Sequence, residues 1–279
     1  MRLAWLAGLA LFALATAPAR GDEWSHQYPL KGKPEVHVKT DDGSVRIETG
    51  AGSEIDARVT TEGWRIGPGE VAITESQTGD RVDIEVRLPK ERSGTGRRSV
   101  AVVLRMPKEA DLEVHTGDGS IHVQPVSGRI SLSTGDGSIT IDGLQGDIRL
   151  HTGDGSIRAT GLSGRLKADT GDGSMNVRGR FDVLDLRTGD GGIDAAAEPG
   201  SKVEAAWSLR SGDGSITLRV PDGLGAELDA HTADGSISVD RPVTVSGTIR
   251  KDALRGPLGP GGPPLQIYTG DGSIRLTGL

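Results

Sequence analysis

Apolar and polar residues alternate through most of this chain, in short runs separated by Asp-Gly turns. Relative to each turn Asp, apolar residues recur six and four positions before it, and three and five positions after it. Around Asp154 they are Ile148, Leu150, Ile157 and Ala159. Alternation with a period of two is typical of strands that bury one face. Each repeat therefore predicts two short strands facing one core.

The turn recurs nine times, and five successive copies lie 18 residues apart. A constant short period indicates stacked structural units. An Asp-Gly turn between alternating strands is also a hairpin signal, so an antiparallel meander competes with a parallel solenoid. Near-identical repeats favour the solenoid, because like residues then stack on like. We predict an all-β fold, a parallel β-solenoid or β-helix with coils of about 18 residues, preceded by an irregular β region.

The chain divides into three parts. Residues 1–21 predict a signal peptide, residues 22–110 an irregular β region that acts as an N-terminal cap, and residues 111–279 the solenoid repeats. A Gly- and Pro-rich insertion near residues 251–264 predicts a loop.

The start of the chain has the order of a secretory signal: a basic residue, the apolar run Leu3–Ala17, and small residues up to Gly21. This run is too short for an ordinary membrane span, although an uncleaved N-terminal anchor is the alternative. We expect an exported protein, periplasmic or extracellular at the cell surface, with no transmembrane segment in the mature chain.

The composition of the chain limits the classes of ligand and partner that it is expected to bind. The chain has no cysteine, which excludes disulfides and thiolate metal sites. Its formal net charge is −7, or −9 once residues 1–21 with Arg2 and Arg20 are removed. An acidic chain with interleaved basic residues disfavours nucleic acid. Aromatic residues make up only 3%, so stacking platforms for sugars are scarce.

The repeated Thr-Gly-Asp-Gly-Ser turn has two interpretations. In the first, it is geometric: Gly tolerates positive φ, Asp bonds nearby backbone amides, and Thr or Ser satisfies other turn groups. In the second, a stacked column of carboxylates about 5 Å apart binds cations such as Ca²⁺. The repulsion between neighbours is only about 0.8 kcal/mol in water, so no metal is required. The candidates for such a ladder are Asp118, Asp136, Asp154, Asp172 and Asp190.

Nothing in the sequence indicates an enzyme. No Gly-x-Ser-x-Gly elbow, zinc helix or phosphate-binding Gly-Lys loop is present. The acidic residues are placed regularly, with no pair whose surroundings would separate an acid from a base. His115, His151 and His231 share one register, but His115 and His151 lie two coils apart and cannot hold one ion. We assign no catalytic residues and no cofactor.

The chain resembles the bacterial putative-adhesin domains of unknown function. The resemblance is carried by the Thr-Gly-Asp-Gly-Ser-Ile units and by two strand-Pro elements, Val103–Pro107 and Leu218–Pro221, and it covers roughly residues 30–279. It implies an exported, β-solenoid-like protein of the cell envelope and brings no catalytic residues.

These observations lead to three hypotheses about function. The first is a non-enzymatic envelope or surface protein, an adhesin-like binding scaffold. The second is a periplasmic structural or envelope-stress component that binds other envelope proteins, and the third, weaker, is a carbohydrate-active β-helix enzyme. The expected partner is thus an envelope protein or a polysaccharide. The last strand, Ser273–Leu279, lacks a cap in the sequence, so we expect the N-terminal region or the inserted loop to cover it, or copies to self-associate there.

Overall fold

The computed structural model describes residues 21–89, 98–240 and 250–279, which form strands, turns and bends. Within these ranges, no helix is long and apolar enough to cross a membrane. The predicted signal peptide lies outside the described residues except for Gly21.

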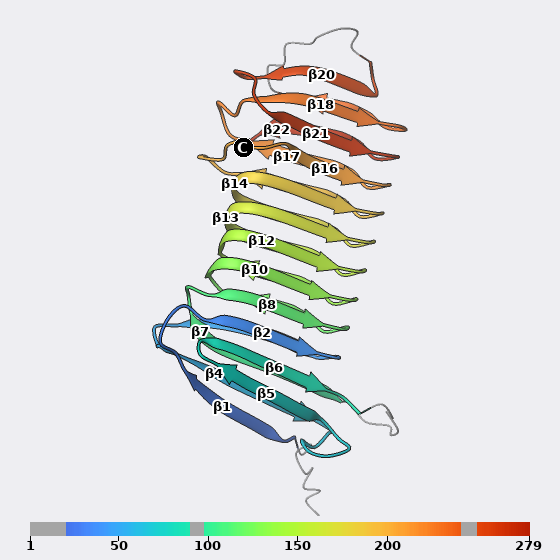
Figure 1. The fold of residues 1–279 in the computed structure, drawn as a ribbon. Helices are drawn as coiled ribbons and strands as arrows, with labels where there is room; N and C mark the ends of the chain where they lie inside the picture. The colour runs from blue at the N-terminus through green and yellow to red at the C-terminus, as the bar shows by residue number, and fades with distance from the viewer. Residues whose placement is uncertain (1–20, 90–97, 241–249) are drawn as a thin grey trace, which may run out of the picture.

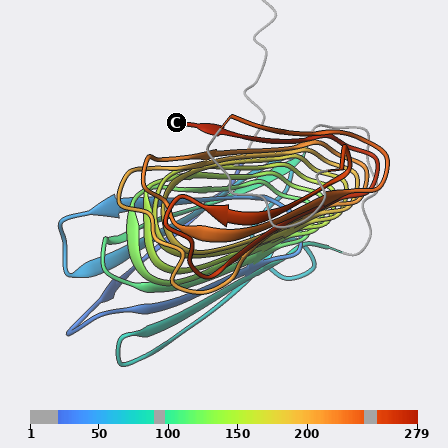
Figure 2. The same cartoon turned by 90° about the horizontal axis from the view of Figure 1, so that it is seen from above.

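The strands form two facing ladders that wind around one long axis, and the molecule is a flattened solenoid (Figures 1 and 2). We call the ladder of strands before the Asp turns sheet 1, and the ladder after them sheet 2. β13 (Ile157–Thr170) and β14 (Met175–Thr188) run around the corner and belong to both. In spatial order, sheet 1 contains β5 (Ala72–Thr78), β6 (Arg81–Arg87), β2 (Glu35–Thr40), β8 (Asp111–Thr116), β10 (Val126–Thr134), β12 (Leu144–Thr152), β13, β14, β16 (Trp207–Ser211), β21 (Pro264–Thr269), β18 (Ala226–Thr232) and β20 (Ala253–Leu258). Sheet 2 contains β1 (Glu23–Pro29), β4 (Glu54–Glu62), β7 (Ser99–Pro107), β3 (Ser44–Gly50), β9 (Ile121–Val123), β11 (Ile139–Asp142), β13, β14, β15 (Ile193–Ala197), β17 (Ile216–Val220), β22 (Ile274–Gly278) and β19 (Ile237–Val239).

The repeats stack in parallel with equivalent residues opposite one another. Ile130 pairs with Ile148, and Ile139 pairs with Ile157. The predicted solenoid is therefore confirmed over the meander. Antiparallel pairs occur only at the ends of the described ladders, where β1, β4 and β5 extend one end and β20 extends the other.

One apolar core fills the space between the sheets along their whole length. It is mostly aliphatic, because each coil contributes its alternating Ile, Leu, Val and Ala residues. Each coil has a second corner, opposite the Asp turn, where the chain passes from sheet 2 back to sheet 1. Leu144 and Leu162 are buried at this corner. Where longer insertions enlarge the cross-section, Phe181 and Trp207 pack edge to face, with ring centroids 6.4 Å apart. Continuous burial of this kind is what stabilises a solenoid.

A column of buried hydroxyl groups ties each Asp turn to the turn before it. Thr152 Oγ1 donates to the carbonyl of Gly137 in the preceding coil (2.8 Å) and accepts the N–H of Gly155 in its own coil (3.1 Å). Thr134 and Thr188 make the same pair of bonds. The hydroxyl thus satisfies one donor and one acceptor that would otherwise be buried without partners. The predicted role of the turn Thr is confirmed.

The turn glycines are required by close stacking rather than by positive φ. A Cβ on Gly137, Gly155 or Gly173 would lie 2.0–2.1 Å from the carbonyl oxygen of the equivalent glycine in the preceding coil. Their φ angles are not in the left-handed region, which instead is occupied at second-corner positions such as Gly146 (φ 119°) and Gly164 (φ 116°). The expectation of positive φ is confirmed at Gly43 (φ 136°) and is wrong at these three glycines, where the restriction comes from the neighbouring backbone.

Chain order and spatial order differ at both ends. The coil β2–β3 lies between β6–β7 and β8–β9, although it precedes both in the sequence. The coil β21–β22 is likewise inserted between β16–β17 and β18–β19. The region 22–110 thus contributes two full coils besides antiparallel strands. Each of these two coils is paired with a coil on either side, so it cannot separate unless a neighbouring coil separates too. This order therefore protects the first and last coils of the chain.

Two expectations about the C-terminal end are wrong. Strand β22 pairs with β17 on one side and β19 on the other, so an earlier coil covers the last strand, and neither the N-terminal region nor the insertion does. The insertion near 251–264 is not simply a loop, because Ala253–Leu258 form β20 and pair antiparallel with β18. The inserted segment therefore extends sheet 1 at this end, and self-association through the last strand would need β22 to lose one of its partners.

The first prediction concerns the hydroxyl column. Thr152→Val keeps the shape of the side chain but removes both hydrogen bonds, and we expect it to lower the free energy of unfolding by about 1–3 kcal/mol. Thr152→Ser keeps the hydroxyl and should cost only about 1 kcal/mol for the lost methyl group. Urea denaturation measures both. A Val variant as stable as the wild type would contradict this role.

The second prediction concerns Asp111, which joins three coils. Its carboxylate accepts hydrogen bonds from Lys33 Nζ (2.6 Å) and from the backbone N–H of Arg129 (2.8 Å), and both lower its pKa. A lowered folded-state pKa stabilises the fold above the unfolded pKa of about 3.9, and this contribution is lost as the pH falls through the folded value.

Asp111→Asn should therefore reduce stability at pH 7 by about 1 kcal/mol, with a difference that shrinks below about pH 4. Asp147→Asn is the matched control, since Asp147 occupies the next-but-one coil in the same register and receives no side-chain hydrogen bond in the described part of the chain. Denaturation at several pH values measures the stability of both variants. Equal changes in the free energy of unfolding at every pH would contradict the role of Asp111.

Candidate functional site

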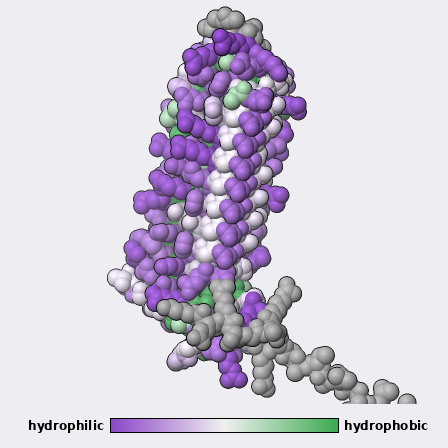
Figure 3. Space-filling view, turned by 90° about the vertical axis from the view of Figure 1, so that its right-hand side faces the viewer, coloured by the Kyte–Doolittle hydropathy of each residue, from purple (hydrophilic) through white to green (hydrophobic). Residues whose placement is uncertain are grey.

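The turn aspartates form one straight column along an edge of the solenoid, visible in Figure 3 as a hydrophilic stripe between paler ones. The five candidates for a cation ladder lie in consecutive coils, and the out-of-order coils continue the column at both ends. In spatial order the column is Asp42, Asp118, Asp136, Asp154, Asp172, Asp190, Asp213, Asp271 and Asp234.

These carboxylates do not bond the turn backbone as expected. From Asp118 onward the column is exposed, and none of its side chains accepts a hydrogen bond from a described residue. That part of the geometric interpretation is wrong, since Thr and Gly alone build the turn. No group of three or more His, Asp or Glu arranged to hold a metal occurs among the described residues. Cation binding by the column stays a prediction.

A groove of about 540 Å³ on the outer face of sheet 1 is lined by charges that neutralise one another. Arg81 hydrogen-bonds Asp83 (3.0 and 3.1 Å), and Arg87 hydrogen-bonds Glu85 (2.9 Å). Each hydrogen bond lowers the pKa of its carboxyl. Charges paired in this way are typical of a solvated surface network and leave few groups for a ligand.

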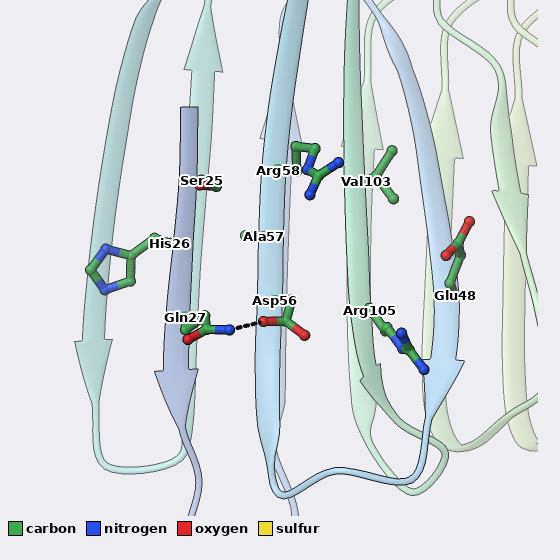
Figure 4. Close-up of a pocket in the computed structure, with 9 residues that line it drawn as sticks. All are labelled: Ser25, His26, Gln27, Glu48, Asp56, Ala57, Arg58, Val103 and Arg105. Carbon is green, nitrogen blue, oxygen red and sulfur yellow. Dashed lines mark hydrogen bonds between the residues drawn. The ribbon is translucent and has the colours of Figure 1, made fainter. Parts of the chain in front are cut away.

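The outer face of sheet 2 has a larger groove, of about 790 Å³, at the end where β1 and β4 add antiparallel strands to the solenoid (Figure 4). We call it the N-terminal groove. Its outward side chains, from β1, β4, β7 and β3, are Ser25, Gln27, Glu48, Asp56, Arg58, Val103 and Arg105.

Strand pairing arranges these side chains in two rows. In the first, Ser25 pairs with Arg58, which pairs with Val103. In the second row, Gln27 pairs with Asp56, Asp56 with Arg105, and Arg105 with Glu48. Paired strands lie about 4.8 Å apart and alternate side chains along a strand about 7 Å apart, so the rows present regularly spaced donors and acceptors.

Arg105 is the central residue of the groove. It lies in register between Asp56 and Glu48, yet neither Arg105 nor Glu48 makes a side-chain hydrogen bond or ion pair with the described residues. Its side chain passes over Gly50, where a Cβ would lie 2.9 Å from Arg105 Nε. Asp56, in contrast, accepts a hydrogen bond from Gln27 Nε2 (2.7 Å). A guanidinium and a carboxylate are thus held on a sheet without partners of their own.

His26 lines the same region but points away from the rows (Figure 4). Its ring packs 4.6 Å from that of Tyr28, and its Nδ1 lies 3.5 Å from Glu75. Burial and the hydrogen bond to Glu75 raise the pKa of Tyr28. His26 therefore contacts Tyr28 and Glu75 rather than the two rows. The groove can form hydrogen bonds with a polar ligand.

The fold and this surface together define a class: an all-β solenoid with polar outer faces. Residues 35–277 match the Toastrack DUF4097 family, and the chain belongs to this family, whose function is unknown. The resemblance inferred from the sequence is therefore confirmed. A search of curated proteins found no match.

Solved structures resemble this chain at low sequence identity. A putative lipid binding protein from Parabacteroides distasonis has a TM-score of 0.52 and 13% identity, with 91% of this chain and 96% of that chain covered. A putative adhesin from Bacteroides fragilis has a TM-score of 0.40 and 9% identity, covering 92% and 97%. A putative cell adhesion protein from Clostridium sporogenes has a TM-score of 0.32 and 11% identity, covering 93% and 100%.

The groove residues were not predicted from the sequence. Polar residues alternate with buried ones in Glu54–Glu62 and Ser99–Pro107, which signals an exposed face. However, nothing in that alternation indicates that Asp56, Arg105 and Glu48 become neighbours, because two of the three strands pair antiparallel and all three are out of chain order.

The third prediction tests the aspartate column. Asp154→Asn removes repulsion with two neighbours, at about 0.8 kcal/mol each, without removing a hydrogen bond from a described residue. It should raise the free energy of unfolding by up to about 1.6 kcal/mol at low salt. The gain should vanish at high salt, where such charges are screened. Thermal melts at two ionic strengths measure it. A large loss of stability would instead mean that the carboxylate supports the turn. A chelator that lowers the wild-type melting temperature would support a cation ladder.

Proposed function

We propose that this protein is a non-enzymatic, adhesin-like binding scaffold of the cell envelope, exported to the periplasm or the cell surface, and that its N-terminal groove binds polysaccharide. The observation that carries the proposal is the pair Arg105 and Glu48, which lie in register on neighbouring strands and form no ion pair with any residue that the structure describes. Charged groups held ready in this way can hydrogen-bond a ligand without first breaking an internal ion pair.

The chemistry of the rows fits a polyhydroxylated chain. Guanidinium groups donate, carboxylates accept, and the amide of Gln27 does both, which matches hydroxyl groups that also donate and accept. The rows run across the strands and along the solenoid axis. A linear polymer that contacts successive residues of a row would therefore lie along this axis. An open groove of this kind admits a chain at any point along its length.

The alternative, a structural or envelope-stress component that binds another protein, has less support. Protein interfaces usually contain an apolar core with aromatic anchors. Among the described residues, the exposed large hydrophobic side chains are Tyr268 and Leu279, and neither lines the N-terminal groove. A lipid inside the fold is also disfavoured, because side chains fill the space between the sheets.

The fourth prediction tests this function with the mature chain, residues 22–279. Polysaccharide and protein fractions of the parent envelope are immobilised separately. We expect saturable retention by polysaccharide, and at least tenfold weaker retention of Arg105→Ala, since a hydrogen bond from a charged group contributes about 1.5–3 kcal/mol.

Arg149→Ala is the matched control, because Arg149 is an exposed arginine on β12 in the other sheet. Circular dichroism should show that both variants are folded. Retention by a defined protein but by no polysaccharide would overturn the proposal in favour of the structural alternative. Equal retention of the Arg105 and wild-type chains would remove the groove as the site.

A further inference from the structure

Tyr268 is an exposed aromatic residue in the interior of sheet 1, at the opposite end of the solenoid from the N-terminal groove. Its side chain is 45% exposed, although β21 is paired on both sides, with β16 and β18. A ring in this position is held by a rigid backbone and faces solvent.

The fold does not require an aromatic residue at this register. The equivalent outward position, two residues before each turn Gly, is Ser133 in β10 and Asp169 in β13, and these coils stack normally. The core contacts of β21 come from Leu265 and Ile267, which point inward. The exposure of Tyr268 is therefore not explained by the stability of the coil.

The side chains around Tyr268 are polar, and several of them end in planar groups. The ring of His231 lies beside it, with centroids 5.7 Å apart and planes tilted by 31°. On its other side Arg210 pairs with Tyr268 across the strands and donates to Gln266 Oε1 (3.4 Å). Asp229, on the far side of Gln266, forms two hydrogen bonds with Arg255 (2.9 and 2.8 Å).

Two buried polar atoms at the edge of this patch have no hydrogen-bond partner among the described residues. Ser208 Oγ lies in the strand next to Gln266, and Asp185 Oδ1 in the strand beyond it. Asp185 does form an ion pair with Arg187 (3.4 Å), but without a hydrogen bond to that oxygen. Buried polar atoms without partners are costly and rare, and they mark a surface where a rearrangement on binding would gain bonds.

We propose that Tyr268, His231, Arg210 and Gln266 form a second saccharide-binding platform. The apolar C–H face of a sugar ring stacks on Tyr268, while its hydroxyl groups bond the guanidinium of Arg210 and the amide of Gln266. This inference rests on the proposed function for its ligand class, a saccharide. The residues of the platform, however, belong to sheet 1, whereas the N-terminal groove lies on sheet 2.

A sugar fits this patch better than a protein does. A protein interface needs apolar area around its aromatic anchor, whereas the cross-strand and diagonal neighbours of Tyr268 described above are Arg, His, Gln, Ser and Asp. A single ring surrounded by planar hydrogen-bonding groups suits a ligand with one apolar face and many hydroxyls. Two sites on opposite faces would also let one molecule hold two polymer strands, with a gain in avidity.

The test measures binding of soluble oligosaccharides released from the envelope polysaccharide, by ligand-observed NMR and calorimetry on the mature chain. Tyr268→Ala should weaken one class of sites by roughly five- to tenfold, and Tyr268→Phe should keep most of the affinity because the ring is retained. Ser133→Ala, in the same register, is the matched control and should bind like the wild type.

The variants separate this inference from the proposed function. If Arg105→Ala weakens binding and Tyr268→Ala does not, the groove stands and the platform is overturned. If only Tyr268→Ala weakens binding, the platform stands and the groove is wrong. Failure of every oligosaccharide to bind overturns both. If the wild type is retained by an envelope protein fraction and only the Tyr268→Ala variant is not, the patch binds a protein and the platform is overturned.

Discussion

The structure depends on the hydrogen bonds that join one Asp turn to the next. At the repeated turns, backbones approach so closely that a side chain on the second glycine cannot be accommodated. A buried Thr or Ser hydroxyl donates to the preceding coil, and at Thr134, Thr152, Thr188 and Ser211 it also accepts an N–H of its own coil. Once this edge is fixed, the alternating residues of both sheets fall into register, and the aliphatic core follows. Such a structure is rigid along its axis, because every coil is bonded to its neighbours at the same points.

Rigidity has a consequence for the outer faces. Side chains that point outward are not needed for stacking, and their identity varies freely from coil to coil. Some of the charged ones pair with neighbours, as Arg81 does with Asp83, whereas others, such as Arg149 and Arg165, form no ion pair with the described residues. In the N-terminal groove, Arg105 and Glu48 lie in register beside each other, and on the opposite sheet Tyr268 exposes an aromatic ring. The scaffold is therefore uniform inside, while its chemistry is concentrated at a few positions on its surface.

Much of the fold was predictable because inward residues repeat with a fixed period. Ile148, Leu150 and Ile157 lie where the alternation places them, and Leu144 fills its corner. The ends were not predictable in the same way. Insertion of β21–β22 between two earlier coils depends on long-range pairing that no local pattern records. The sequence also could not separate the role of Thr from that of Asp in a motif where both recur together. The groove was missed because its rows combine strands from distant parts of the chain.

Footprinting of arginine side chains by mass spectrometry, with and without envelope polysaccharide, tests the central claim most directly. Arg58 and Arg105 lie in the N-terminal groove, whereas Arg149 and Arg165 are exposed on sheet 1 away from both proposed sites. The account predicts that polysaccharide protects Arg58 and Arg105 from modification and leaves Arg149 and Arg165 reactive. Unchanged reactivity of Arg58 and Arg105 at saturating polysaccharide would contradict it.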